Sequence, residues 1–386
     1  MRVAIISSSF YPAISYGGPI SATWDIAKGL SNKGISVYVS TTNANGSDKL
    51  DVKVNSFIKK QSNLFVKYYN EQIINRFSFE FVFGVWSDIK QADRIYIQYI
   101  FHYTVFIALM FSFFLRKKVI LCPRGSLSPY ALKYKHKWKK RIWLFFFIRP
   151  FVKKVIWHAS SYIEKDDIRC VFHRARIVEI SDGVLCEDFS NTFKMSKVDL
   201  VNKFTKHNCK DVSELFFSMG RLHSSKGFDV VIDAFDLFVE NNPYAKLIIA
   251  GSDDGFKTKL INQIKKLNLS NSVFLIGSVD HKDKVLLLKN SSAFVLASSF
   301  ESFGIVIAES LASGTPVIVS NRTPWKDIEN NKCGIFTENN SDSFYNAFCD
   351  FQKMTFNSRV IQDFVCLNFD SRVIVNKFID VIKSKD

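Results

Sequence analysis

The sequence lacks several features that define whole classes of protein. Its longest candidate for an uncharged apolar run spans residues 101–115, which is too short to cross a membrane as a helix. The first residues reach a run of serines after four apolar residues and have no signal-peptide core, so we expect a cytoplasmic chain. The seven cysteines show no C-x-x-C spacing, and their number is odd. We therefore expect all seven to be reduced, with neither a disulfide framework nor a structural zinc site.

Acidic residues are missing from one long internal stretch. Residues 94–163 contain 14 lysines and arginines and no aspartate or glutamate. The whole chain carries a net charge of +16, and residues 1–190 hold 28 basic and 14 acidic side chains, against 24 and 22 in residues 191–386. The first half therefore holds most of the excess, and we expect it to face solvent or an anionic partner. Nucleic acid, an anionic membrane and a phosphorylated substrate all remain open as that partner.

Short apolar runs alternate with amphipathic stretches along the chain. In the first half, this pattern predicts strands at 3–7, 37–42, 95–99 and 119–122 and helices at 21–32 and 101–115. In the second half, five predicted strands alternate with four helices. These strands are 215–219, 247–250, 273–276, 293–297 and 317–319, and the helices are 228–239, 257–267, 282–290 and 303–312.

This alternation predicts an α/β protein with two Rossmann-like, doubly wound domains facing a central cleft. Residues 1–190 form the first predicted domain and residues 191–365 the second. A helix within 366–386 is expected to return to the first domain. Such sheets bind ligands beyond the carboxyl ends of their strands, so the loops at those ends are the places to look for a site.

Charged residues and glycines follow the predicted strands of the second half. Arg221 and Lys226 share one strand-to-helix loop, where two cations beside helix N-termini could bind a diphosphate. The alternative is a solvated basic loop. Gly251 and Gly277 follow the next two strands and could approach a ligand closely, or they could be ordinary turn residues.

Two glutamates bracket the last predicted strand-to-helix junction. Glu301 is expected at the start of the helix, and Glu309 lies eight positions later, roughly 10 Å further along nearly the same face. The backbone N–H groups of Ser302, Phe303 and Gly304 are expected to be free helix-start donors suited to phosphate. Glutamates at this spacing are common by chance, but chance explains poorly their combination with the Arg/Lys loop.

Taken in order, these motifs resemble the retaining GT-B glycosyltransferases of family 4. The resemblance rests on Gly220-Arg221-Leu222-His223-Ser224-Ser225-Lys226-Gly227, Ala250-Gly251, Glu301 with Glu309, and the opening Gly17-Gly18-Pro19 loop. It covers nearly the whole chain. Residues 123–132 also resemble a subgroup found in bacterial surface polysaccharide clusters.

The resemblance implies a hexosyltransferase-type enzyme (EC 2.4). Such an enzyme moves a sugar from a nucleotide-diphosphate sugar to an acceptor hydroxyl with retention of the anomeric configuration. The setting that it implies is O-antigen (lipopolysaccharide), capsule or exopolysaccharide assembly. By the same resemblance, Arg221 and Lys226 would stabilise the departing diphosphate and Glu301 would hold hydroxyls of the donor sugar.

Further donor contacts are implied in the same way. Glu309 would hold the ribose hydroxyls, the Gly17-Gly18 loop would approach the phosphates, and residues from Gly277 to Val279 would meet the base. The family often places a histidine near the reacting sugar carbon. Here the Pro-x-Gly position carries Arg124 instead, and His102 is the other candidate. The alternative for His102 is a capping or packing role after the strand that precedes it.

No Asp-x-Asp triplet occurs, and we expect no metal or other cofactor, because two cations and helix-start amides can stabilise a diphosphate without one. The implied acceptor is a glycan or a glycan linked to undecaprenyl diphosphate. Residues 138–154 mix aromatic and basic side chains as interfacial helices do, which predicts peripheral binding to an anionic membrane at the inner face of the plasma membrane. The alternative is a core helix with a solvated basic face.

Two rival functions fit parts of the sequence. A basic anion- or nucleic-acid-binding protein would explain the charge, but no recognised nucleic-acid motif accompanies it, and we expect no nucleic-acid partner. A GT-B nucleotide-sugar epimerase would keep the fold and change the chemistry.

Overall fold

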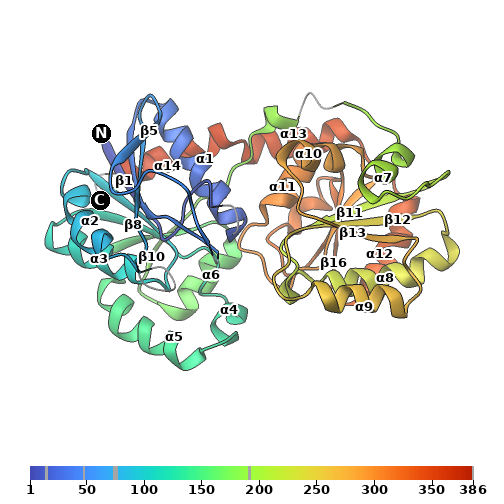
Figure 1. The fold of residues 1–386 in the computed structure, drawn as a ribbon, viewed down its shortest axis with the longest axis horizontal. Helices are drawn as coiled ribbons and strands as arrows, with labels where there is room; N and C mark the ends of the chain where they lie inside the picture. The colour runs from blue at the N-terminus through green and yellow to red at the C-terminus, as the bar shows by residue number, and fades with distance from the viewer. Residues whose placement is uncertain (14–15, 47, 73–76, 190–192, 385–386) are drawn as a thin grey trace. The chain divides into compact units, whose positions relative to one another are not determined.

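The computed structural model describes residues 1–13, 16–46, 48–72, 77–189 and 193–384. The chain divides into two compact units. Unit 1 comprises Met1–Gly183 and Ser371–Asp386, and unit 2 comprises Val184–Asp370. The chain thus leaves unit 1 after Gly183 and returns at Ser371, whereas the sequence predicted these crossings at 190 and 366. Figure 1 labels many of the helices and strands of both units.

Unit 1 is built on an eight-stranded sheet with the order β10-β9-β8-β7-β1-β2-β6-β5. All neighbours pair in parallel except β5, which is antiparallel to β6. The strands are β1 (Arg2–Ile6), β2 (Ser36–Thr42), β5 (Phe57–Gln61), β6 (Leu64–Tyr69), β7 (Arg94–Gln98), β8 (Lys118–Cys122), β9 (Val155–Ala159) and β10 (Arg176–Glu179). A small ladder of β3 (Ala44–Asn45) and β4 (Asp48–Lys49) stands apart.

The longer helices of unit 1 are amphipathic or apolar segments that pack in unit 1 around the sheet, whereas the two short helices at Pro129–Lys133 and Lys137–Trp143 have no buried residues. They are α1 (Gly18–Asn32), α2 (Phe79–Lys90), α3 (Tyr103–Phe114), α4 (Pro129–Lys133), α5 (Lys137–Trp143), α6 (Tyr162–Val171) and α14 (Ser371–Lys383), with a π-helical turn at Leu144–Ile148 and a 3₁₀ turn at Arg149–Phe151. Serine side chains accept N–H groups at the starts of α2 and α6, which fixes where these helices begin. Within the described residues, no helix is both long enough and apolar enough to span a bilayer.

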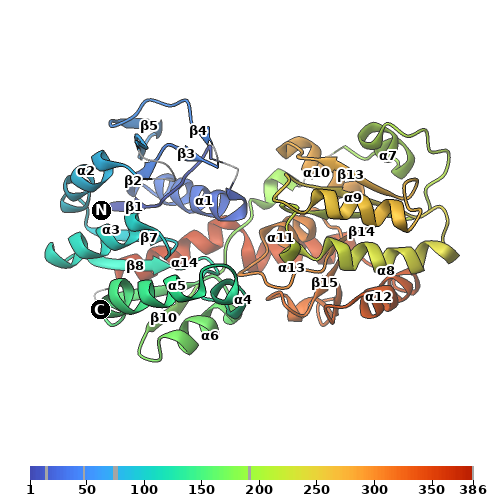
Figure 2. The ribbon, with the colours of Figure 1, turned by 60° about the horizontal axis from the view of Figure 1, so that its bottom comes forward.

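The last helix, α14, packs on α1 within unit 1. Its Val375 and Phe378 lie in the same apolar cluster as Ile26 and Leu30 of α1. Gly29 faces Val375 so closely that a Cβ at this position would overlap the valine side chain. Figures 1 and 2 both show α14 beside α1.

Unit 2 has a six-stranded, wholly parallel sheet with the order β13-β12-β11-β14-β15-β16. The strands are β11 (Leu215–Met219), β12 (Lys246–Ala250), β13 (Val273–Gly277), β14 (Ala293–Leu296), β15 (Val317–Ser320) and β16 (Gly334–Thr337). The first five confirm the predicted strands, and β16 is additional. Near-continuous apolar sequences are expected here, because a parallel sheet is covered on both faces.

The helices of unit 2 lie on both faces of its sheet, with α8, α9 and α12 on one side and α10, α11 and α13 on the other (Figure 1). They are α7 (Lys197–Thr205), α8 (Phe228–Asn241), α9 (Lys257–Lys266), α10 (His281–Asn290), α11 (Ile305–Ala312), α12 (Ser341–Lys353) and α13 (Ser358–Phe369). Helix α11 begins at Ile305, two residues later than predicted, because Gly304 precedes it as N-cap with a φ of 82°.

The expectation that all seven cysteines are reduced is wrong for two of them. Cys186, in a 3₁₀ turn at Cys186–Phe189, forms a disulfide with Cys366 of α13, and their Cα atoms are 5.9 Å apart. The two residues are 180 positions apart in the sequence, so local cysteine spacing could not reveal the pair. Both belong to unit 2.

Candidate functional site

The sheet of unit 2 has a switch point between β11 and β14. From β11 the chain adds β12 and β13 on one side and then crosses to β14 on the other. Ligands of open α/β sheets bind outside the carboxyl ends of the strands at such a point. The loops that leave β11 and β14 there carry two of the predicted site residues, Lys226 and Glu301.

These two loops are joined by an ion pair. Lys226 Nζ donates to Glu301 Oε1 at 2.5 Å, and the Ser298 hydroxyl donates to the same oxygen at 2.7 Å. The lysine and glutamate side chains are 21% and 12% exposed, so the pair is partly shielded from water and still reachable from the surface. A cation and a carboxylate at this position can bind a phosphate group and sugar hydroxyls side by side.

A second ion pair involves a residue that the sequence analysis missed. Lys284 of α10 donates to Glu309 of α11 at 2.5 Å, and both side chains are largely buried. The two residues are 25 positions apart on different helices, so no local spacing connects them. Glu309 therefore has a fixed partner that holds its carboxylate in place.

Arg221 lies on the rim of the same sheet edge. Its guanidinium donates to Asp254 Oδ2 at 2.5 Å, and both side chains are well exposed. The neighbouring Asp253 accepts the backbone N–H groups of three consecutive residues, the last of which is the first residue of α9. These hydrogen bonds lower the pKa of the Asp253 carboxyl. The acidic pair at 253–254 thus serves the loop and the Arg221 side chain.

Close backbone packing explains two glycines of the family-like motif. A Cβ on Gly251 would overlap the carbonyl oxygen of Gly220, and a Cβ on Gly227 would overlap that of Ala297. Gly277, by contrast, has a φ of 77° and open space around the position of a Cβ. For Gly251, close packing of the backbone already explains the glycine without a ligand. At Gly277, the open space leaves room for a ligand.

The residues before α11 are arranged differently from the prediction. Ser302, Phe303 and Gly304 precede the helix, so their N–H groups are not those of its first turn. The Phe303 ring is buried against Trp325 and Phe369. The backbone carbonyl oxygen of Phe303 accepts the Trp325 indole N–H at 2.6 Å. Val279 lies in the loop between β13 and α10 and packs partly against the core.

A polar pocket opens beside Glu301 at the carboxyl ends of β15 and β16. Its volume is about 420 Å³, and its lining residues are Ser299, Asn321, Arg322, Glu338, Asn339 and Asn340. The backbone N–H of Glu301 donates to the carbonyl oxygen of Arg322 at 3.3 Å, which ties this pocket to the Lys226–Glu301 pair. Amide, hydroxyl and charged side chains together are suited to sugar hydroxyls.

Unit 1 has its own switch point, between β1 and β7. Gly17, with a φ of 76°, is the N-cap of α1 after β1, and Gly18 is the first residue of that helix. His102 is the N-cap of α3 after β7, and its Nδ1 accepts the backbone N–H of Thr104 at 3.4 Å. The structure thus shows the capping role left open for His102, at a helix start beside the switch point. Its catalytic role stays a prediction.

Arg124 is held inside unit 1. Its side chain is only 1% exposed, and the guanidinium donates to Asp182 Oδ1 at 2.5 Å and to Gln98 Oε1 at 2.8 Å. Burial by itself lowers the pKa of Arg124, but the Asp182 carboxylate raises it overall. The predicted place of Arg124 beside the reacting carbon stays a prediction, and this burial weighs against it.

A buried histidine lies next to this ion pair, and sequence analysis gave no sign of it. His158 Nε2 contacts the Ile180 carbonyl oxygen at 2.7 Å, and Nδ1 contacts the Tyr96 hydroxyl at 2.8 Å. Since a carbonyl oxygen can only accept, Nε2 carries the proton and Nδ1 accepts from the tyrosine. Burial, helped by the positive charge of Arg124, lowers the pKa of His158 to about 4.

A family model matches the region that carries the ion pairs of unit 2. Residues 202–353 match the family model described as "Glycosyl transferases group 1". The mannosylfructose-phosphate synthase of Agrobacterium fabrum is 33% identical over 114 residues, which are 28% of this chain and 25% of that protein. The α-1,3/1,6-mannosyltransferase ALG2 of Dictyostelium discoideum is 29% identical over 155 residues, 36% of this chain and 37% of that protein. The matched segments therefore span well under half the length of these relatives.

Several solved structures align with nearly the whole chain. The Anabaena protein Alr3699/HepE, crystallised with UDP and glucose, aligns with 99% of both chains at a TM-score of 0.77 and 20% identity. The chain has the GT-B fold. Within this GT-B chain, the segment that matches the family model lies wholly in unit 2 and contains both the Lys226–Glu301 and the Lys284–Glu309 pairs.

Proposed function

We propose that the protein is a glycosyltransferase that moves a sugar from a nucleotide-diphosphate sugar to an acceptor hydroxyl with retention of configuration. The observation that carries this proposal is the Lys226–Glu301 pair at the switch point of a sheet whose sequence matches the glycosyltransferase family model. A cation for the leaving diphosphate and a carboxylate for the donor sugar are the two groups that this chemistry needs side by side.

In this proposal, Lys226 and Arg221 stabilise the negative charge that grows on the diphosphate as the glycosidic bond breaks. Glu301 binds hydroxyls of the donor sugar, and Glu309, held by Lys284, binds the ribose hydroxyls. The Gly17–Gly18 helix start of unit 1 supports phosphate binding by the same physical argument. The two cations supply the electrostatic stabilisation that a divalent metal provides in other transferases, so the reaction proceeds without a metal.

The proposed acceptor is a lipid-linked glycan, and the proposed setting is bacterial surface polysaccharide assembly. Its support is the resemblance of residues 123–132 and the acid-free basic stretch from 94 to 163. Trp138, Phe145 and Phe146 are exposed near α5, and Arg149 lies over the Phe145 ring at 5.4 Å. Exposed aromatic rings among cations fit peripheral binding to an anionic leaflet.

A donor screen tests the transferase proposal. The protein is incubated with a panel of nucleotide sugars, beginning with UDP-sugars, and both nucleotide-diphosphate release and the sugar products are measured. Release with at least one donor, and transfer to an added glycan or slow hydrolysis, is expected with and without EDTA. A product that is only an isomeric nucleotide sugar would favour the epimerase, and no binding of any nucleoside diphosphate would refute the proposal.

Liposome co-sedimentation tests the membrane proposal separately. Each lysine or arginine near an anionic leaflet is worth about 1 kcal/mol, so changing Lys137, Lys139, Lys140 and Arg141 to serine should sharply reduce binding at low salt. Raising the salt to 1 M should mimic the substitution, because the Debye length shrinks to ~3 Å. Binding that is equal for neutral and anionic liposomes would contradict the proposal.

A further inference from the structure

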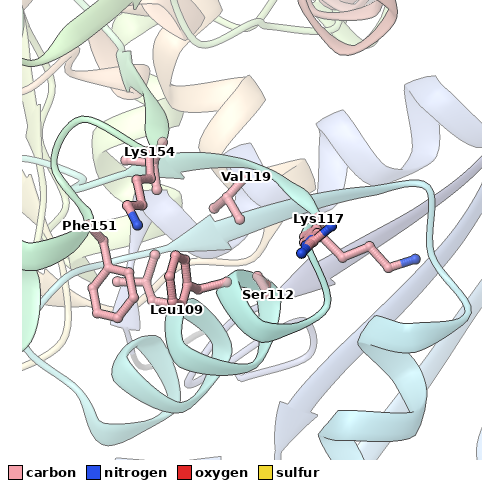
Figure 3. Close-up of a pocket in the computed structure, with 9 residues that line it drawn as sticks. Leu109, Ser112, Lys117, Val119, Phe151 and Lys154 are labelled. Carbon is pink, nitrogen blue, oxygen red and sulfur yellow. The ribbon is translucent and has the colours of Figure 1, made fainter.

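A second cavity lies in unit 1, at the amino-terminal ends of the parallel strands, opposite to the end that carries the switch point. It has a volume of about 250 Å³ and lies between the C-terminal end of α3 and the first residues of β8 and β9. Its lining residues are Leu109, Ser112, Phe113, Arg116, Lys117, Val119, Phe151, Lys154 and Val155. Figure 3 shows Phe151 and Lys154 at one end, Lys117 at the other, and Leu109 and Ser112 of α3 between them.

The charges of this pocket favour an anion. Three of its nine lining residues are cationic and none is acidic. The Lys117 ammonium is already committed, since it donates to the carbonyl oxygens of Lys90 and Ala92 at 2.8 and 2.6 Å. Within the described part of the chain, the Arg116 guanidinium has no hydrogen-bond or ion-pair partner, and the Lys154 ammonium only lies over the Phe113 ring, 3.8 Å from its centroid.

Ser112 provides an independent sign of a ligand. Its hydroxyl is fully buried in the structure and has no hydrogen-bond partner among the described residues. A buried hydroxyl without a partner costs about 1 to 3 kcal/mol, so such groups are rare unless something binds to them. Ser112 lines the same pocket as Arg116 and Lys154, and its hydroxyl could donate to an oxygen of a bound anion.

The rest of the pocket wall is apolar and continues onto the surface. Phe113 packs edge-on against Phe151, with their ring centroids 6.1 Å apart, and both Phe113 and Phe114 are exposed. A free phosphate ion would gain nothing from these rings. A phosphate joined to an acyl chain would use both the cations and the apolar wall.

We propose that this pocket binds the headgroup phosphate of an anionic phospholipid, with the start of an acyl chain lying over Phe113 and Phe151. Its volume is below the ~300–1,000 Å³ typical of sites that enclose a drug-sized ligand, so it takes a headgroup and leaves the chains outside. The pocket lies within the acid-free stretch of residues 94–163, so none of its lining residues would repel an anionic surface. This pocket is a specific lipid contact within the proposed membrane association, and the inference rests on that association.

Calorimetry of the full chain with dihexanoyl-phosphatidylglycerol, below its critical micelle concentration, tests the site. We expect saturable binding that Arg116→Ala and Lys154→Ala each weaken about tenfold. Lys153→Ala is the matched control, because it removes the same charge from the adjacent exposed position outside the pocket, and it should change the affinity less than twofold. Equal weakening by Lys153→Ala and Lys154→Ala would overturn the proposal.

Two further arms distinguish a phospholipid site from a general affinity for lipid or for phosphate. Dihexanoyl-phosphatidylcholine and inorganic phosphate should both bind at least tenfold more weakly than the anionic lipid, and equal affinity for either would refute a phospholipid headgroup site. Ser112→Ala should weaken lipid binding and at the same time raise the melting temperature of the lipid-free protein, because it removes an unsatisfied buried hydroxyl. Unchanged lipid affinity in this variant would refute the assignment of Ser112.

The experiment needs neither a sugar donor nor a bilayer. Loss of the lipid site would therefore leave the proposed sugar transfer intact, and a failed donor screen would leave the lipid result standing.

Discussion

Replacing Glu309 by alanine should weaken the binding of nucleoside diphosphate. In the structure, one carboxylate oxygen of Glu309 accepts Lys284 at 2.5 Å, and the other has no partner among the described residues. The second oxygen is therefore free to accept ribose hydroxyls. Hydrogen bonds to a charged group are worth about 1.5 to 3 kcal/mol, so the dissociation constant should rise about 10- to 150-fold.

Isothermal calorimetry with UDP, or with the diphosphate that the donor screen selects, measures this change. Glu309→Gln keeps an acceptor for Lys284 but removes the charge, so its affinity should fall between those of wild type and Glu309→Ala. Glu240→Ala is the control, because Glu240 is an exposed glutamate at the end of α8 in the same unit. Circular dichroism checks that each variant is folded, since Glu309→Ala also leaves the largely buried Lys284 unpaired.

A folded Glu309→Ala protein that binds within twofold of wild type would remove Glu309 from the nucleotide site. Lys284→Ala gives a second readout. If Lys284 only positions the carboxylate, this variant should lose less affinity than Glu309→Ala, and a larger loss would mean that the lysine itself binds the ligand.

Three other predictions concern catalysis and stability. Lys226→Ala should lower kcat by about 10² to 10³ with little change in nucleoside binding, because the charge on the leaving group is greatest in the transition state. Arg221→Ala should lower kcat to a smaller extent, because Arg221 is exposed. An unchanged kcat with a raised KM would contradict both predictions. The His158 pKa of about 4 in the folded chain lies below its unfolded value. The stability that the neutral His158 contributes is therefore complete above pH 6.5, and up to about 3 kcal/mol of it is lost as the pH falls toward 4. Urea unfolding at pH 7, 6, 5 and 4 should show this fall in the free energy of unfolding, and His158→Gln should reduce the fall. Gly227→Ala should lower the free energy of unfolding by more than about 2 kcal/mol, because the new Cβ would overlap a backbone carbonyl at a φ of 65°, and equal urea midpoints for mutant and wild type would disprove this.

Hydrophobic pattern predicted the central strands of both sheets because those strands are buried on two faces. The strands 215–219 and 247–250 became β11 and β12 with shifts of one residue at most. Five strands of the two sheets were not predicted, namely β5, β6, β9 and β10 of unit 1 and β16 of unit 2. β5, at one edge of unit 1, is half exposed and contains Lys59 and Lys60, so it has no continuous apolar run.

The candidate site could be predicted only where its residues share a loop or follow a strand. Lys226 and Glu301 were found because each follows a predicted strand end, and parallel strands bring those ends to one edge. Lys284 was not found, because its pairing with Glu309 depends on how α10 packs on α11. The burial of Arg124 depends on Asp182, which is 58 positions away, and such a distance leaves no periodic signal.

The placement of α14 has a consequence for the order in which the protein is made. Four side chains of this helix, Ile374, Val375, Phe378 and Ile382, belong to an apolar cluster of unit 1. Translation at about 5–20 residues per second therefore separates the end of the first segment at Gly183 from α14 by roughly 10 to 40 s. During that interval, unit 2 emerges complete, while the α1 surface that α14 will cover stays open to water and to chaperones. The unit that leaves the ribosome first is thus the last to close.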